Sequence, residues 1–405
     1  MNVVITPKRL AGAVRVPASK SAAHRALIGA ALSDGPTVLR ISALNRDIEA
    51  TMGCLRALGA RFRVSEGSVA VTPVKRVPEH AELDCGESGS TLRFLLPVAC
   101  ALGASAHVVG HGRLPLRPNA ALTEALRAHG ASVDSDLLPM NLSGPVRGGA
   151  WALPGDVSSQ YVTGLLFALP LLREDSEIVL TTKLASAAYV DMTLDALKRF
   201  GIEVHPTGTG WRVPGGQAYR SPEEIDVEGD WSAAAFWLAA NALGADIRLE
   251  GLRDDTAQGD RAIQTLLGQK AIDAEHVPDL VPALAVAAAS LPQTTVITGA
   301  ARLRLKESDR LATTCALLRA LGHRCRMTED GLVIQGGPPE DTGEPIRTVD
   351  GANDHRIVMA AAVAAAFADR PVRITGAEAV DKSYPDFFRD FQALGGLHHV
   401  EHPGK

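Results

Sequence analysis

The sequence predicts an α/β protein made of six similar units. Three observations in the 405-residue chain predict it: a glycine that recurs at helix ends, a β-hairpin pattern after several of these glycines, and six apolar helices that each begin in a polar cluster. The glycines and the helix starts recur in step, which places both in one repeated unit. We therefore expect six copies of an α/β unit with buried helices.

The recurrent glycines mark the ends of helices. An apolar residue stands four positions before the glycine in Leu55-x-x-Leu58-Gly59, and the pattern returns at Gly130, Gly201, Gly322 and Gly395, with a weaker copy at Gly268. Glycine readily adopts the left-handed conformation that closes a helix. The glycines lie 54 to 73 residues apart, a spacing that predicts a repeated unit.

Two short alternating segments separated by a turn follow several of these glycines. Residues 62–64 and 69–71 flank Glu66-Gly67, and residues 325–327 and 332–334 flank Asp330-Gly331. A glycine-containing turn between two segments of period two is typical of a β-hairpin. Each unit is therefore expected to continue from a helix into a β-hairpin.

A polar cluster precedes an almost wholly apolar helix six times, at Lys20, Ser90, Ser159, Trp231, Asp279 and Asp354. The simplest interpretation of any one cluster is an N-cap. Many clusters, however, also hold a cation or an amide, and helix N-termini attract anions. We therefore expect a polyanionic small substrate, or two anionic ones, held by basic residues from the set Lys20, Arg25, Arg93, Arg113, Arg117, Lys306, Arg310, Arg356 and Lys382.

Two groups of charged residues have competing interpretations. Asp279 lies between Pro278 and Pro282 and before apolar residues, so it is either an ordinary helix cap or a desolvated carboxylate that can act as a base. The alternating charges of Lys306-Glu307-Ser308-Asp309-Arg310 are, taken alone, typical of a solvated helix face.

Composition excludes several classes of protein. With 46% hydrophobic residues and a net charge of -5, the chain is not a disordered one, and its acidic balance argues against nucleic acid as a partner. No apolar run reaches the roughly 18 residues that a membrane helix needs, and residues 283–291 are read as a buried helix. Scattered Cys54, Cys85, Cys100, Cys315 and Cys325 predict reduced thiols in a core and a cytoplasmic protein.

The motifs of several common enzyme classes are missing from the sequence. It contains no GxxxxGK[ST], no GxGxxG after a strand, no HExxH and no GxSxG. His398, His399 and His402 suggest a metal site at first sight, but we expect them to lie in a frayed, polar tail.

Six stretches of the chain resemble the motifs of one enzyme family. They are Pro17-Ala18-Ser19-Lys20-Ser21-x-x-x-Arg25-Ala26-Leu27, Gly86-x-Ser88-Gly89-Ser90-x-x-Arg93, Gly112-Arg113-x-x-x-Arg117-Pro118, Ser158-Ser159-Gln160, Lys306-Glu307-Ser308-Asp309-Arg310 and Asn353-Asp354-His355-Arg356. Over residues 5–394 the chain resembles the 5-enolpyruvylshikimate-3-phosphate synthase family. The resemblance implies a two-domain inside-out α/β barrel of six βαβαββ-like units, with residues 1–18 and 228–405 in one domain and 19–227 in the other.

The resemblance also implies a reaction, part of aromatic amino-acid biosynthesis. The enolpyruvyl group of phosphoenolpyruvate would pass to the 5-hydroxyl of shikimate 3-phosphate, releasing phosphate, with no metal and no organic cofactor. One base and one acid, held among cations, would be needed. A monomer is expected, with no nucleic acid or membrane as partner. Gly89, which has no methyl group to project into the phosphoenolpyruvate site, implies sensitivity to glyphosate.

Carried over by position, the resemblance assigns a role to each motif residue. Asp279 resembles the base that engages the hydroxyl, and Glu307 the group that protonates the methylene carbon. The residues implied for phosphoenolpyruvate are Lys20, Gly89, Arg113, Gln160, Arg310, Arg356 and Lys382. Those implied for shikimate 3-phosphate are Ser21, Arg25, Ser158, Ser159, Gln160, Ser186, Tyr189, Asp279 and Lys306, with Lys306 paired to Asp279.

Two departures from the family pattern leave alternatives open. Glu87 and Arg302 stand where the family commonly has Asn, and an anionic Glu87 beside a phosphate site is unfavourable unless it points away or pairs with an arginine. The alternatives are a UDP-N-acetylglucosamine enolpyruvyl transferase, a paralogue with another acceptor, or a silent anion-binding paralogue. The first usually has a reactive cysteine in the loop that corresponds to residues 110–118, and this loop has none.

Overall fold

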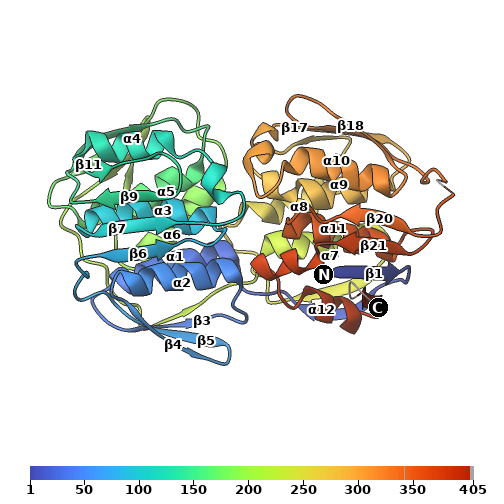
Figure 1. Cartoon of the computed structure of the whole chain (residues 1–405), viewed down its shortest axis with the longest axis horizontal. Coiled ribbons are helices and arrows are strands. Elements are labelled where there is room, and N and C mark those ends of the chain that lie inside the picture. Colours follow the sequence, from blue (N-terminus) through green and yellow to red (C-terminus); the bar gives the residue numbers. More distant parts are fainter. Residues whose placement is uncertain (342, 402–405) are drawn as a thin grey trace. The chain divides into compact units, whose positions relative to one another are not determined.

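The computed structural model describes residues 1–341 and 343–401. The chain divides into two compact units, each with its own hydrophobic core. Unit 1 comprises Met1–Pro17 and the chain from Gly229 onward, and unit 2 comprises Ala18–Glu228. Figure 1 shows helices and small sheets in both. The strands described form six sheets, five of four strands and one of two.

The three sheets of unit 2 share one topology, βαβαββ. In each, the first two strands are parallel, the last strand pairs antiparallel with the second, and the other strand of the hairpin pairs antiparallel with the last at the edge of the sheet. The first copy is β6 (Ala81–Asp84), α3 (Gly89–Ala101), β7 (Ser105–Val109), α4 (Ala120–Ala128), β8 (Ser132–Val133) and β9 (Met140–Ser143). The second is β10 (Gly149–Leu153), α5 (Ser159–Ala168), β11 (Ser176–Leu180), α6 (Ala187–Arg199), β12 (His205–Pro206) and β13 (Gly210–Val213). The third takes its first strand from the end of the unit: β14 (Glu224–Asp226), α1 (Lys20–Leu32), β3 (Thr37–Arg40), α2 (Arg46–Ala57), β4 (Arg61–Ser65) and β5 (Ser68–Thr72).

Unit 1 repeats the same topology twice and then departs from it. One full copy is β16 (Ala271–Asp273), α9 (Val281–Ala289), β17 (Thr294–Thr298), α10 (Arg310–Ala320), β18 (Arg324–Met327) and β19 (Leu332–Gln335). The other is β20 (Arg347–Asp350), α11 (His355–Ala366), β21 (Val372–Thr375), α12 (Phe387–Ala393) and β22 (Leu397–Glu401), completed by the N-terminal strand β1 (Asn2–Thr6) between β21 and β22.

The remaining copy in unit 1 is shortened. It consists of β2 (Ala11–Arg15), α7 (Trp231–Ala242), β15 (Asp246–Glu250) and α8 (Ile263–Leu266), and its sheet has two strands. Strand β16 begins at Ala271, just after Gly268, so the chain has no room for a hairpin there. The weaker helix-end pattern at Gly268 lies at the end of this shortened copy, just after α8.

The predicted helix ends are confirmed. Six glycines adopt positive φ angles between 73° and 110°: Gly59, Gly130, Gly201, Gly268, Gly322 and Gly395. Ser19, Ser88, Ser158, Asp230 and Asp354 each accept a hydrogen bond from a backbone amide in the first turn of their helices. All residues of α9 are buried, as expected of the alanine-rich segment.

The cysteines and the C-terminal histidines have different outcomes. All five cysteines are buried free thiols, as predicted. The expectation of a frayed tail is wrong for His398 and His399, because they lie in β22 and pair with β1. The third histidine of that group, His402, falls outside the described residues.

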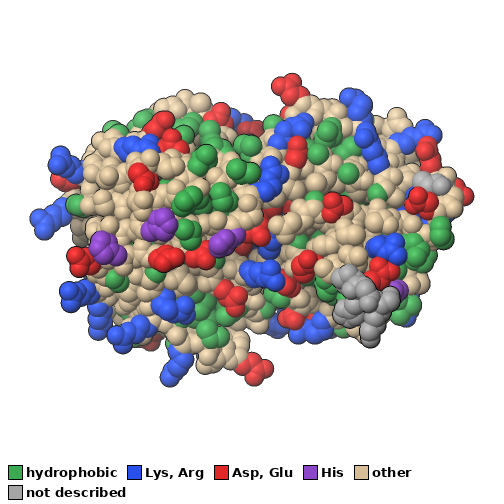
Figure 2. All heavy atoms as spheres, viewed as in Figure 1, with side chains coloured by type: hydrophobic (Ala, Val, Ile, Leu, Met, Phe, Trp, Pro, Cys, Tyr) green, Lys and Arg blue, Asp and Glu red, His purple; other side chains and the backbone are tan. Residues whose placement is uncertain are grey.

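The described surface mixes charges of both signs. On the face shown in Figure 2, Lys and Arg side chains are interspersed with Asp and Glu. In contrast, several cations singled out in the sequence are buried, including Arg310, Arg356 and Lys382. Within the described ranges, no helix combines the length and the apolar character needed to cross a bilayer.

Candidate active site

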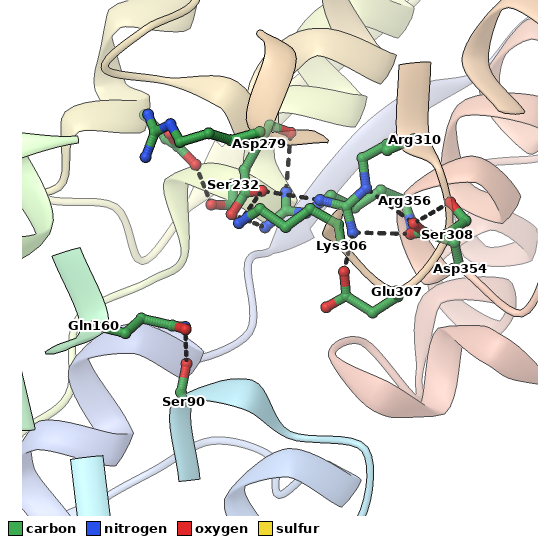
Figure 3. Close-up of polar contacts among 12 residues, drawn as sticks. Ser90, Gln160, Ser232, Asp279, Lys306, Glu307, Ser308, Arg310, Asp354 and Arg356 are labelled. Carbon is green, nitrogen blue, oxygen red and sulfur yellow. Dashed lines mark hydrogen bonds and ion pairs between the residues drawn. The ribbon is translucent and has the colours of Figure 1, made fainter. Parts of the chain in front are cut away.

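In unit 1, the residues at the N-termini of α9, α10 and α11 meet in one network of charges around Asp279. Asp279 lies in a 3-10 turn (Pro278–Leu280) directly before α9. Its carboxylate is 2.9 Å from Nη1 of Arg310, 3.1 Å from Nη2 of Arg356 and 3.6 Å from Nζ of Lys306. Figure 3 shows these side chains pointing toward one another. Asp279 is thus not a helix cap: its carboxylate is held by three cations.

The surroundings of Asp279 decide its protonation state. Burial alone would raise its pKa, but Arg356, Lys306 and Arg310 hold the pKa well below its usual range. Asp279 is therefore ionised at neutral pH. Any group that draws the cations away, such as an anionic ligand, will make the carboxylate more basic.

Arg310 joins the two carboxylates to which the family resemblance assigns the roles of base and acid. Its Nη2 atom is 2.5 Å from Oε2 of Glu307, its Nη1 atom binds Asp279, and its Nε atom donates to Asp354 over 2.9 Å. The side chain of Arg310 is 1% exposed. The solvated-face interpretation is therefore wrong for Arg310, because three carboxylates offset the cost of burying its charge. Glu307 and Asp279 become neighbours through this guanidinium.

Lys382 contacts the loop before α11. Its Nζ atom donates a hydrogen bond to the carbonyl oxygen of Asn353 over 2.7 Å. Ala352 and Asn353 both adopt left-handed φ angles, 51° and 53°. Such conformations are costly for residues with a Cβ, and they concentrate at functional sites. Lys382 thus supports a strained loop that leads into Asp354 and Arg356.

In unit 2, a lysine at the N-terminus of α1 forms an ion pair with a buried carboxylate. Nζ of Lys20 lies 2.8 Å from Oδ2 of Asp47, and both side chains are largely buried. Five residues further along α1, Arg25 donates to the carbonyl oxygens of Ser21 and Tyr189 and to Oγ1 of Thr193. These bonds fix Ser21, Arg25 and Tyr189 relative to one another.

Gln160 is fixed at the N-terminus of α5 by two neighbours. Its Oε1 atom accepts a hydrogen bond from Nη1 of Arg93 over 2.7 Å, and its Nε2 atom donates to Oγ of Ser90 over 3.0 Å. Figure 3 shows the Gln160–Ser90 contact. Ser158 caps the same helix, and Ser159 is its first residue. Gln160 is therefore oriented by α3, the helix that starts at Gly89.

Arg117 is a residue that the assignment by resemblance missed. Its guanidinium lies against Gly89, where a Cβ atom would come within 2.6 Å of Nη1. Its buried Nε atom has no hydrogen-bond partner in the part of the chain that the structure describes. Arg113, which the resemblance assigned to phosphoenolpyruvate, is exposed. The sequence signal for Arg117 is its position directly before Pro118 and Asn119, the N-cap residue of α4. Arg93 of α3 donates hydrogen bonds to Oδ1 of Asn119 and to the carbonyl oxygen of Pro118. These bonds hold the start of α4, and with it Arg117, near α3.

Ser186 stands at the start of α6 in an unusual conformation. It is buried, and its φ angle of 56° lies in the left-handed region. It occupies the N-cap position without a side-chain capping bond. Its hydroxyl is therefore not used to close the helix, unlike that of Ser158.

The two departures from the family pattern have structural explanations. The carboxylate of Glu87 lies against Gly112, whose φ angle is 57° and which leaves no space for a Cβ atom. Glu87 is thus directed at the loop of residues 110–118. Nη2 of Arg302 donates to the carbonyl oxygen of Glu275 over 2.7 Å, so Arg302 holds the segment that leads to Asp279.

Comparison with known proteins decides the family. The chain matches the family EPSP synthase (3-phosphoshikimate 1-carboxyvinyltransferase) over residues 4–271 and 261–391. This chain belongs to the EPSP synthase family. The 3-phosphoshikimate 1-carboxyvinyltransferase of Clostridium perfringens is 37% identical over 98% of this chain and 99% of its own length. That of Halobacterium salinarum is 39% identical, again over 98% and 99%.

The fold also matches a solved EPSP synthase. The structure of EPSP synthase from Acinetobacter baumannii superposes with a TM-score of 0.82 at 27% identity, covering 99% of this chain and 100% of that one. The six small sheets are thus those of the EPSP synthase fold. In the described ranges, no three His, Cys, Asp or Glu side chains are grouped so that they could bind a metal ion.

Proposed function

We propose that this protein is an EPSP synthase, which transfers the enolpyruvyl group of phosphoenolpyruvate to the 5-hydroxyl of shikimate 3-phosphate and releases phosphate. The observation that carries the proposal is the bridging of two carboxylates, Asp279 and Glu307, by the buried Arg310 in a chain of this family. The product supplies aromatic amino-acid biosynthesis.

The reaction needs an acid and a base. Protonation of C3 of phosphoenolpyruvate makes C2 electrophilic, and the 5-hydroxyl oxygen attacks C2 as it loses its proton. The resulting tetrahedral intermediate then loses a proton from C3 and expels phosphate, which restores the double bond. Stabilising the phosphate and carboxylate charges along this path requires several fixed cations.

Unit 1 is proposed to supply the acid–base chemistry. Asp279 would accept the hydroxyl proton, and Glu307 would donate a proton to C3. Dianionic substrates compete with Asp279 for Lys306, Arg310 and Arg356, so substrate binding weakens the ion pairs of Asp279 and raises its basicity. The same competition releases Glu307 from Arg310, so that its carboxyl can hold a proton.

Unit 2 is proposed to hold anionic groups of both substrates. Lys20, Gln160 and the backbone at Gly89 are assigned to phosphoenolpyruvate together with Arg310, Arg356 and Lys382 of unit 1, and Arg117 is added to them. Arg113 stays a prediction for the same ligand. For shikimate 3-phosphate the proposed residues are Ser21, Arg25, Ser158, Ser159, Gln160, Ser186, Tyr189, Asp279 and Lys306. We infer as well that the two units are the two domains of an inside-out α/β barrel.

The test is phosphate release by the purified protein. We expect phosphate when phosphoenolpyruvate and shikimate 3-phosphate are both present, and none when either is omitted. A parallel reaction with UDP-N-acetylglucosamine as acceptor should stay silent. Activity with that acceptor alone would contradict the proposal, and no phosphate with either acceptor would favour a silent paralogue. That the protein is a monomer is a prediction that sedimentation can test, and that it is cytoplasmic is a prediction that cell fractionation can test.

A further inference from the structure

Asp260 is a buried carboxyl beside the Asp279 network that the proposed chemistry leaves without a role. It lies in a 3-10 turn (Gly259–Ala262) that packs against the N-terminus of α7, and it is 4% exposed. Oγ of Ser232, in the first turn of α7, donates a short hydrogen bond to its Oδ2 atom. Among the described residues this hydroxyl is the one partner of the carboxylate, which forms no ion pair.

The charged groups near Asp260 come from three other elements. Asp279 precedes α9, Arg356 lies in α11 and Asp230 caps α7. The one cation among them is already engaged, because Arg356 donates to the backbone oxygen and to Oδ2 of Asp279 over 3.2 and 3.1 Å. Asp260 is therefore a buried acid with two acidic neighbours and no cation of its own.

These surroundings favour the protonated acid. Burial and the charge of Asp279 raise the pKa of Asp260 to about 7, and Arg356 and the hydroxyl of Ser232 offset only part of this rise. The carboxyl thus gains and loses its proton in the physiological range. Asp279, directly before α9, stays ionised throughout that range because its pKa is held well below its usual value.

We propose that Asp260 is a positioning residue for this reaction, which controls the availability of Arg356 by exchanging a proton with solvent while Ser232 holds its carboxyl in place. This inference rests on the proposed function. When Asp260 is protonated, Arg356 serves Asp279 and the incoming anion. When Asp260 is ionised, a second carboxylate competes for Arg356, and its charge repels an anionic ligand.

The consequence is a pH-dependent affinity for phosphoenolpyruvate. Between about pH 6 and about pH 8, KM for phosphoenolpyruvate should rise in the wild type. In Asp260→Asn the charge cannot form, so the rise should be smaller by a factor of at least about three. The phosphate groups of the substrates titrate too, but they affect both proteins equally. Asp246→Asn, an exposed position on β15 in the same unit, is the matched control and should behave like the wild type.

A second variant distinguishes a titrating group from a merely structural one. Ser232→Ala removes a hydrogen bond to the ionised carboxylate, so Asp260 should hold its proton more tightly. The rise in KM should therefore persist and move to higher pH. A purely structural role for the pair would make both variants weaken binding at every pH alike.

Thermal unfolding supplies a readout that does not depend on activity. Because the pKa of Asp260 is raised in the folded protein, the native state binds more protons than the unfolded state between about pH 4 and about pH 7. Stability from this group is present at low pH and is lost as the pH rises toward the folded pKa. The Tm of Asp260→Asn relative to the wild type should therefore increase between about pH 5 and about pH 8.

The outcomes separate this inference from the proposed function. The role of Asp260 would be overturned if the wild type is active, Asp260→Asn shows the same change of KM with pH as the wild type, and the Tm difference between the two proteins does not change with pH. A wild type that releases no phosphate would contradict the proposed function, and the Tm series would still establish whether Asp260 titrates near neutrality.

Discussion

The guanidinium of Arg117 occupies the space that a side chain at Gly89 would need. A Cβ atom at Gly89 would lie 2.6 Å from Nη1 of Arg117 and 3.0 Å from its Cζ atom. Contacts this short force one group to move, and Arg117 is itself buried. Because Gly89 has no side chain, the start of α3 leaves room for the guanidinium of Arg117, which comes from the loop before α4.

Gly89→Ala should displace Arg117 and weaken phosphoenolpyruvate binding. We expect KM for phosphoenolpyruvate to rise about tenfold, because a shift of about 1 Å in a positioning group has effects of this order or larger. Inhibition by glyphosate, expected for the wild type at millimolar concentration, should weaken as well. The control is Gly53→Ala in α2, where no atom lies within 4 Å of the added methyl. Equal kinetics in the two variants would contradict the role of Gly89.

Arg117 and Arg113 are both proposed to bind phosphoenolpyruvate, and substituting the buried Arg117 should have the larger effect. Arg117→Gln should reduce kcat/KM for phosphoenolpyruvate about 100-fold, the usual scale for losing a fixed charged donor to a reacting anion. Arg113→Gln, at an exposed position where solvent screens the charge, should reduce it by about tenfold. Steady-state kinetics at saturating shikimate 3-phosphate would decide. A larger loss in Arg113→Gln than in Arg117→Gln would contradict the role proposed for Arg117.

Asp279→Asn and Glu307→Gln should each lower kcat by about 10² to 10⁴, the range for removing a general base or acid. Substrate binding should survive, because the cations remain. Rapid-quench detection of the tetrahedral intermediate would show which step each variant slows. An Asp279→Asn variant that keeps the full rate would refute its role as the base.

Acid should remove a specific part of the stability of unit 1. The pKa of Asp279 is well below that of an unfolded aspartate, so its contribution is present above about pH 4 and is lost as the pH falls through the folded pKa. Asp279→Asn should therefore be less stable than the wild type at about pH 7, and the difference should shrink toward about pH 3. Urea unfolding at the two pH values measures it. A difference that stays constant with pH would argue against the ion pairs seen here.

The repeated unit was predictable because its signals are local. Six helix ends are marked by a glycine such as Gly59, and five helix starts by a capping residue such as Ser88. The insertion of β1 between β21 and β22 was not predictable from the residues, because strand pairing over almost the whole chain has no local signature. His398 and His399 were misjudged for the same reason: polar residues on an edge strand resemble a tail.

The site was predictable to different degrees. The prolines beside Asp279 indicated a desolvated carboxylate, whereas Lys306-Glu307-Ser308-Asp309-Arg310 depended on the family resemblance, because its charges alone are typical of a surface helix. Nothing near Asp260 distinguishes it from a surface aspartate. Its burial arises from the packing of its turn on α7, and that packing is a property of the folded unit.

The pairing of β1 with β21 and β22, and of β2 with β15, ties the beginning of the chain to its end. Unit 2 is continuous in sequence, so a ribosome delivers all of it before unit 1 is complete. Strands β1 and β2 therefore stay without their partner strands until more than two hundred further residues have been synthesised. Synthesis order thus favours unit 2 as the first part to fold, and a nascent chain stalled before β21 would expose β1 to chaperones.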